Sequence, residues 1–184
     1  MKFSRSLRAA AVPVVALLLA LGGCAGTAPT ASGPATTGSS SASGWTYTDD
    51  IGNTVALPAA PTRVAGFTDQ VLSLMSYGVT PVAVFGRTDV ASDTRFAGYD
   101  MAGVAITGNT YGEIDLEALA QARPDLIVTV IYPSDREGTI DTTQPYYGFK
   151  DLEQQEKLAA IAPIVTIKVG GAGRDVIEAN TRLA

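Results

Sequence analysis

Two patterns of hydrophobic and polar residues follow one another after residue 44. Residues 45–58 alternate apolar and polar side chains on either side of Asp50-Ile-Gly-Asn53, which predicts a small antiparallel hairpin. Beyond the hairpin, apolar residues gather in short runs bounded by polar or glycine-containing segments, a pattern typical of buried strands. These predicted strands cover residues 63–67, 82–85, 104–106, 126–130 and 164–169.

The segments between these runs carry apolar residues at helical spacing. Asp115 is a suitable N-cap for one of these helices, and Pro124 ends it. One face of this helix is expected to consist of Leu116, Leu119 and Ala120. Because strands and helices alternate along the chain, the predicted fold is α/β with a mainly parallel, Rossmann-like sheet. The other helices are predicted over residues 69–77, 149–161 and 174–184.

The first 23 residues have the three parts of an export signal: a basic start, an apolar stretch over residues 9–21, and two glycines before Cys24. The apolar stretch is shorter than the about 20 residues that span a bilayer, which predicts a signal that is cleaved. Leu21-Gly22-Gly23-Cys24 resembles the bacterial lipobox, in which the cysteine is lipidated and becomes the new N-terminus. The alternative is an ordinary secretory signal, but Cys24 is the only cysteine and has no disulfide partner within the chain.

Residues 25–44 consist only of Ala, Gly, Thr, Pro and Ser, so they lack the large apolar side chains that a core requires. Together with Cys24 they are predicted to form a disordered linker over residues 24–44 between a lipid anchor and a folded body. The expected location is therefore extracytoplasmic, at a bacterial cell membrane.

Charge and composition narrow the functional classes. The chain carries 13 basic and 18 acidic residues. Without the three basic residues of the signal, 10 basic residues stand against 18 acidic ones, and this net charge of −8 argues against nucleic acid or an anionic membrane face as the partner. It contains no histidine, which removes the usual general base and most zinc sites. Gly170-Gly-Ala-Gly173 lacks the third glycine of a dinucleotide-binding motif, because Val176 stands in its place. We therefore expect no catalytic residue, no metal site of the protein's own and no cofactor.

Five segments, in this order, resemble the substrate-binding lipoproteins of ABC importers for ferric siderophores, cobalamin and haem. None of the segments is specific alone, but their order and the preceding lipobox are typical of that family. They are the D-x-x-G-x-x-V-x-L-P hairpin of residues 49–58, P-x-R-V of residues 61–64, Y-G-V-T-P-V-A-V of residues 77–84, the stretch from Gly108 through D-L-E-A-L-A to R-P-D-L-I-V at residues 123–128, and K-L-A-A-I-A-P-I-V of residues 157–165.

The resemblance implies a non-catalytic, membrane-tethered receptor that captures an iron–siderophore complex for an ABC permease, with cobalamin or haem as alternatives. Members have two α/β lobes joined by a long helix, so residues 45–171 would be the N-terminal lobe and residues 172–184 the start of that helix. The second lobe would then be absent, and we expect this chain to be a fragment. An exported α/β enzyme such as an esterase would need G-x-S-x-G and a histidine, which these residues lack. A surface interaction module would explain the tether but not the order of the segments.

Ligands of open parallel sheets bind beyond the carboxyl ends of the strands. Aromatic rings and a guanidinium at these ends suit a bulky chelate, although each residue could equally be an ordinary polar loop residue. The candidate ligand contacts are Thr68, Asp69, Arg87, Tyr111 and Tyr132; Arg95 and Arg136 lie in longer loops, and Tyr146 and Tyr147 could be either surface residues or ligand contacts. By the resemblance, Glu117 would contact the permease, while a solvated helix carboxylate is the alternative.

Overall fold

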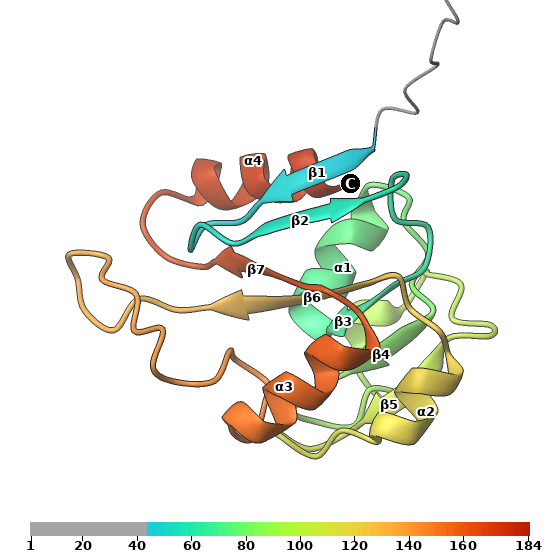
Figure 1. The fold of residues 1–184 in the computed structure, drawn as a ribbon. Helices are drawn as coiled ribbons and strands as arrows, with labels where there is room; N and C mark the ends of the chain where they lie inside the picture. Colours follow the sequence, from blue (N-terminus) through green and yellow to red (C-terminus); the bar gives the residue numbers. More distant parts are fainter. Residues whose placement is uncertain (1–43) are drawn as a thin grey trace, which may run out of the picture. The chain divides into compact units, whose positions relative to one another are not determined.

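The computed structural model describes residues 44–184 as one α/β unit (Figure 1). The predicted signal sequence, Cys24 and nearly all of the predicted linker lie outside the described residues. The elements of this unit follow the order expected from the hydrophobic pattern. A hairpin of β1 (Trp45–Thr48) and β2 (Thr54–Leu57) comes first, and strands alternate with helices after it.

Five parallel strands form the main sheet, in the order β5-β4-β3-β6-β7. The prediction of an α/β fold with a parallel sheet is confirmed, and within the described residues every pairing of this sheet is parallel. β3 lies in the centre, between β4 and β6. The strands are β3 (Val64–Phe67), β4 (Ala83–Phe85), β5 (Ala105–Gly108), β6 (Leu126–Ile131) and β7 (Ile164–Lys168).

Helices cover both faces of the sheet (Figure 1). α1 (Thr68–Ser76) and α4 (Gly173–Leu183) pack against each other and, with the hairpin, cover one face. α2 (Leu116–Gln121) and α3 (Leu152–Ile161) pack together on the other face. A short 3-10 helix, η1 (Thr94–Phe96), extends the apolar packing around α1.

Alternate residues of the buried strands point to opposite faces of the sheet and so belong to two separate hydrophobic cores. Leu126 and Val128 of β6 face the hairpin and α4, whereas Ile127 faces α2 and α3. All six residues of β6 are buried, because both faces of the strand are covered. Full burial of such apolar side chains is the main source of stability, about 1.5–3 kcal/mol for each one.

The hairpin is fixed to the edge of the sheet by two carboxylates. Asp49 is 5% exposed. Its Oδ2 accepts hydrogen bonds from the backbone N and the Oγ1 of Thr166, at 3.2 and 3.1 Å. Its Oδ1 accepts from the backbone N of Ile51 and Asn53 within the turn. Asp50 accepts a bond of 2.8 Å from the backbone N of Lys168. On the outer edge of β7, the backbone donors of Thr166 and Lys168 are therefore satisfied by side chains instead of a further strand.

Two details of the sequence prediction are wrong. Ala120 faces solvent, because α2 is only six residues long and turns Leu119 toward the core. The helix expected from residue 149 begins at Leu152, since the carboxylate of Asp151 caps it by accepting from the backbone N of Gln154 at 2.8 Å. Phe149 is instead a fully buried core residue before the helix.

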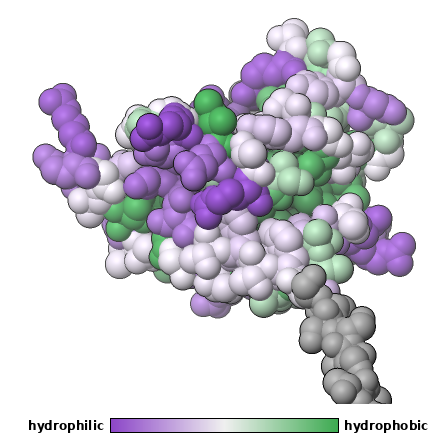
Figure 2. Space-filling view, turned by 90° about the horizontal axis from the view of Figure 1, so that it is seen from above, coloured by the Kyte–Doolittle hydropathy of each residue, from purple (hydrophilic) through white to green (hydrophobic). Residues whose placement is uncertain are grey.

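The surface on the side of α4 and the hairpin is mainly hydrophilic or neutral, with hydrophobic residues in limited patches (Figure 2). Ile177 of α4 is the most exposed large apolar side chain of the described residues, at 61%. Among residues 44–184, no helix has the length and apolar character that crossing a membrane requires.

Candidate functional site

The site lies at the carboxyl ends of the strands, where the strand order changes direction. From β3 the chain goes to β4 and β5 on one side, and β6 and β7 lie on the other side. Open parallel sheets bind ligands at such a switch point, because the loops leaving the two central strands diverge there. The segments that follow β3, β4, β5 and β6 bring Thr68, Arg87, Tyr111 and Tyr132 to this edge.

Three tyrosines form the centre of the site. The ring centroid of Tyr147 lies 5.1 Å from that of Tyr111 and 4.9 Å from that of Tyr132, both in edge-to-face geometry. Phe67, at the end of β3, supports the Tyr147 ring from within the protein at 5.3 Å. Tyr111 and Tyr132 are 44% and 42% exposed, whereas Tyr147 is half-buried between them. The arrangement offers ring surface and phenol groups to a ligand.

Arg87 is the cationic group of this tyrosine cluster. Its Nη1 donates a hydrogen bond of 3.1 Å to the hydroxyl of Tyr147. That bond, together with the more distant Asp69, raises the pKa of Arg87 above its ordinary value. Within residues 44–184, no carboxylate oxygen lies within 4.0 Å of its guanidinium, so its remaining donors face solvent. Such donors suit carbonyl or carboxylate oxygens of a ligand.

Burial also affects Tyr132. Removal of the phenol from water raises its pKa, and the charge of Asp69 acts in the same direction. Tyr132 therefore remains a neutral hydrogen-bond donor at physiological pH.

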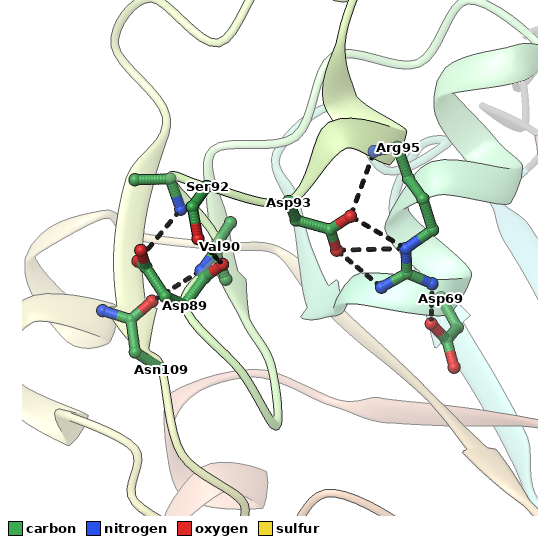
Figure 3. A network of polar contacts seen from close by, with 8 residues as sticks. Asp69, Asp89, Val90, Ser92, Asp93, Arg95 and Asn109 are labelled. Carbon is green, nitrogen blue, oxygen red and sulfur yellow. Dashed lines mark hydrogen bonds and ion pairs between the residues drawn. The ribbon is translucent and has the colours of Figure 1, made fainter.

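Asp69 and Arg95 form an ion pair at the rim of the site (Figure 3). Arg95 Nη1 contacts Asp69 Oδ1 at 2.6 Å, and Arg95 Nη2 contacts Asp93 Oδ2 at 2.6 Å. Hydrogen bonds to Asp93 and then to Asp69 raise the pKa of Arg95, and the same Arg95 contacts lower the pKa of Asp93. Asn109 Oδ1 holds the same loop by accepting from the backbone N of Val90 at 2.9 Å. The network fixes the loop that carries Arg87.

The structure brings Arg87, Tyr111 and Tyr132 together, in agreement with their positions at the strand ends. It places the other predicted contacts differently. Thr68 is 3% exposed and packs beneath Gly86, and Asp69 is engaged by Arg95. Whether any of these residues touches a ligand remains a prediction.

Three further candidates lie outside the tyrosine cluster. Arg136 lines a hollow of about 460 Å³ between the ends of β6 and β7, next to Tyr132. Tyr146 accepts a hydrogen bond from Asn53 Nδ2 at 3.0 Å. Glu117 is exposed on α2, and its Oε1 accepts from Gln121 Nε2 at 3.3 Å.

Among the described residues, no group of three or more His, Cys, Asp or Glu side chains is arranged to hold a metal ion.

The residue that sequence reasoning did not single out is Tyr147. The sequence shows two adjacent tyrosines, and no local signal distinguishes them. The distinction comes from the backbone. The N of Tyr147 donates to the carbonyl of Val130 at 3.1 Å, and its carbonyl accepts from Thr129 Oγ1 at 2.6 Å. This pairing with β6 directs the ring of Tyr147 to the strand ends.

No protein-family model matches the sequence, and none of the curated proteins matches it either. Among solved structures, DesE, a ferric-siderophore receptor protein from Streptomyces coelicolor, matches with 28% sequence identity and a TM-score of 0.61. The match covers 76% of this chain and 47% of DesE. In its fold and in part of its sequence, the chain is similar to this ferric-siderophore receptor protein. It spans about half the length of DesE.

Other periplasmic binding proteins match less closely. The siderophore periplasmic binding protein from the fuscachelin gene cluster of Thermobifida fusca is 23% identical, with a TM-score of 0.46, over 69% of this chain and 43% of that protein. Staphylococcus aureus SirA, solved in complex with staphyloferrin B, is 20% identical, with a TM-score of 0.46, over 76% of this chain and 44% of SirA.

Proposed function

We propose that this chain forms one lobe of a substrate-binding lipoprotein that captures an iron–siderophore complex and delivers it to an ABC permease. The observation that supports this most directly is the cluster of Arg87, Tyr111, Tyr132 and Tyr147 at the switch point of a periplasmic binding protein fold. The likeness to a ferric-siderophore receptor favours a siderophore over cobalamin or haem, which the same fold could bind.

The chemistry of the cluster suits a chelate whose iron stays coordinated by the siderophore. The Arg87 guanidinium donates hydrogen bonds to the siderophore oxygens that coordinate the iron, and these oxygens carry the negative charge of the siderophore. The exposed rings of Tyr111 and Tyr132 pack against apolar parts of the siderophore, while their hydroxyls reach its polar groups. The receptor binds without making or breaking a covalent bond, so it needs no catalytic group and no cofactor of its own.

The remaining parts of the proposal concern attachment and transport. Lipidation of Cys24 would anchor the receptor on the outer side of the bacterial cell membrane, and residues 25–44 would give the lobe reach from the bilayer. Glu117, exposed on α2, would meet a basic residue of the permease. If the lipid-anchored protein bound neither a siderophore nor a permease, it would instead be a surface interaction module.

Ligand titration of the full-length protein encoded by the gene tests the proposal. Tryptophan and tyrosine fluorescence is recorded while ferric complexes of a trihydroxamate, a tricatecholate and citrate are added, with cobalamin and haem as alternative ligands. We expect quenching at sub-micromolar concentrations of one ferric complex. The Arg87→Gln variant should bind it about tenfold or more weakly, because a hydrogen bond from a charged group contributes about 1.5–3 kcal/mol.

Arg174→Gln is the matched control, because Arg174 is exposed on α4 and contacts only the neighbouring Asp175. Its affinity should equal that of the wild type. Silence with all three ferric complexes would overturn the proposal, and quenching by cobalamin or haem alone would reassign the ligand. Equal binding by the Arg87 variant would remove Arg87 from the site.

A further inference from the structure

We propose that Tyr147 is a positioning residue, which holds Arg87 and the two exposed tyrosines in the arrangement that receives the ligand. The inference rests on the proposed function of this site and adds a residue that acts through its neighbours. Tyr147 is the only described residue whose ring lies against both Tyr111 and Tyr132 and whose hydroxyl also binds Arg87.

The ring of Tyr147 is held on a rigid base. Phe67, which is fully buried in the core, meets it edge-to-face at 5.3 Å. The residue after it, Gly148, has a φ of +93°, and a Cβ there would lie 2.7 Å from the Phe67 ring. Only glycine therefore allows the backbone to lie this close to Phe67 with this φ. The close approach brings the Tyr147 ring directly over the end of β3.

The backbone of Tyr147 is tied to β6 on both sides. Its N–H donates to Val130, and its carbonyl accepts from the fully buried Thr129 Oγ1. The segment between β6 and α3 otherwise runs through exposed residues 134–137 and 141–144. Tyr147 is thus the point at which this long connection returns to the sheet.

Arg87 needs such a support because it is an exposed side chain with many rotamers. A free arginine loses rotamer freedom when it binds a ligand, and this loss weakens affinity. The bond to the Tyr147 hydroxyl fixes the guanidinium before the ligand arrives and leaves its other donors directed to solvent. Removal of this hydroxyl should therefore weaken binding through Arg87, without removing a ring from the site.

Tyr146 provides a matched control next to Tyr147 in the chain. Its hydroxyl accepts from Asn53 Nδ2 at 3.0 Å, and its ring lies near Phe149 in the core beside α2 and α3. Tyr146→Phe removes one exposed hydrogen bond, as Tyr147→Phe does, but not at the strand ends. A general effect of losing a tyrosine hydroxyl would appear in both variants.

The first measurement needs no ligand. NMR spectra of the full-length protein with ¹⁵N-labelled arginine report the guanidinium signals, and the Arg87→Gln variant identifies those of Arg87. We expect separate, slowly exchanging Nη–H signals of Arg87 in the wild type and in Tyr146→Phe, because the hydrogen bond restricts rotation. These signals should collapse in Tyr147→Phe. Unchanged signals in Tyr147→Phe would overturn the proposal.

The second measurement is a double-mutant cycle with the ferric complex that quenches the wild type. Tyr147→Phe should weaken binding about threefold to tenfold, as expected for one preorganising hydrogen bond. In the Arg87→Gln background the same change should have almost no effect, because Tyr147 acts through Arg87. Tyr146→Phe should bind as the wild type does.

The two proposals fail in different ways. If no ferric complex binds the wild type, the proposed function fails, and the NMR signals of Arg87 still test the role of Tyr147. If the wild type binds and Tyr147→Phe weakens binding equally with and without Arg87, then Tyr147 contacts the ligand itself and the positioning role is wrong.

Discussion

Arg87 and Arg95 are both exposed arginines in the loop after β4, yet their neighbours differ. Arg95 is engaged by Asp93 and Asp69, whereas Arg87 contacts only a phenol hydroxyl. The sequence places Arg87 at a strand end and Arg95 further along the loop, which agrees with their positions in the structure. The sequence does not show that Asp69 forms an ion pair with Arg95, because the two residues are 26 positions apart in the chain.

The adjacent tyrosines 146 and 147 show a second limit at this scale. The side chains of neighbouring residues in an extended segment point to opposite sides, so one tyrosine reaches the strand ends and the other the hairpin. The tyrosine that reaches the strand ends is the one whose backbone is hydrogen-bonded to Thr129 and Val130 of β6. No local sequence pattern predicts these hydrogen bonds.

Tyr47 yields a prediction on pH. Its hydroxyl donates to the carbonyl of Ala179 at 3.1 Å, and burial raises its pKa from 10.0 to about 12, although Arg182 above the ring acts in the opposite direction. The folded state thus keeps the proton longer than the unfolded state does. The resulting stability is fully present below pH 10 and is lost as the pH rises toward 12.

Urea denaturation at several pH values measures this effect. The wild type should be more stable than Tyr47→Phe by a constant amount up to pH 10, and the difference should shrink between pH 10 and 12. Phenol absorbance should show that a tyrosine that ionises near pH 12 in the folded wild type is missing from the variant. A constant difference at all pH values would contradict the raised pKa.

At the scale of elements, the hydrophobic pattern predicts which segments are strands and helices, because the strands are short apolar runs between polar or glycine-containing segments and the helices carry apolar residues at helical spacing. The pattern does not give the order of strands. The pairing of β3 with β6 joins Val64 to Leu126, and nothing in either run specifies its partner. The pattern also predicts the wrong face for Ala120, because α2 is too short for spacing to define its buried side.

The hairpin yields a prediction at this scale. Asp49→Ala removes the acceptor of the Thr166 backbone N–H and leaves that buried donor without a partner. The change should lower the free energy of unfolding by about 2–4 kcal/mol, since bonds to a carboxylate are strong and an unpaired buried donor is costly. Urea denaturation measures the loss.

The control for Asp49 is Asp141→Ala, which removes an exposed turn carboxylate that accepts only from Thr143. It should change stability by less than about 0.5 kcal/mol. Equal losses in the two variants would show that the contact between the hairpin and β7 contributes little.

At the scale of the whole molecule, the tyrosine cluster is an open surface. Pockets for small molecules cover about 70–90% of their ligand, but Tyr111 and Tyr132 remain more than two-fifths exposed. A ligand held at this surface would therefore need further covering surface beyond the tyrosine cluster.

Transport yields the prediction for Glu117. Glu117→Arg should reduce siderophore uptake by cells by about tenfold or more, because a like charge would face the basic residue proposed for the permease. Affinity for the ferric complex should not change. Glu178→Arg, an exposed charge reversal on α4 at the opposite face of the sheet, is the control and should leave uptake intact. Lost affinity with normal uptake would place Glu117 at the ligand.

The central position of β3 has a consequence for biosynthesis. β4 leaves the ribosome soon after β3, but β6 follows about sixty residues later, as the register of Val64 with Leu126 requires. At about 5–20 residues per second, one edge of the nascent β3 waits about 3–12 s for its neighbour. During that interval the growing polypeptide cannot complete its sheet, because the edge of β3 that pairs with β6 has no partner.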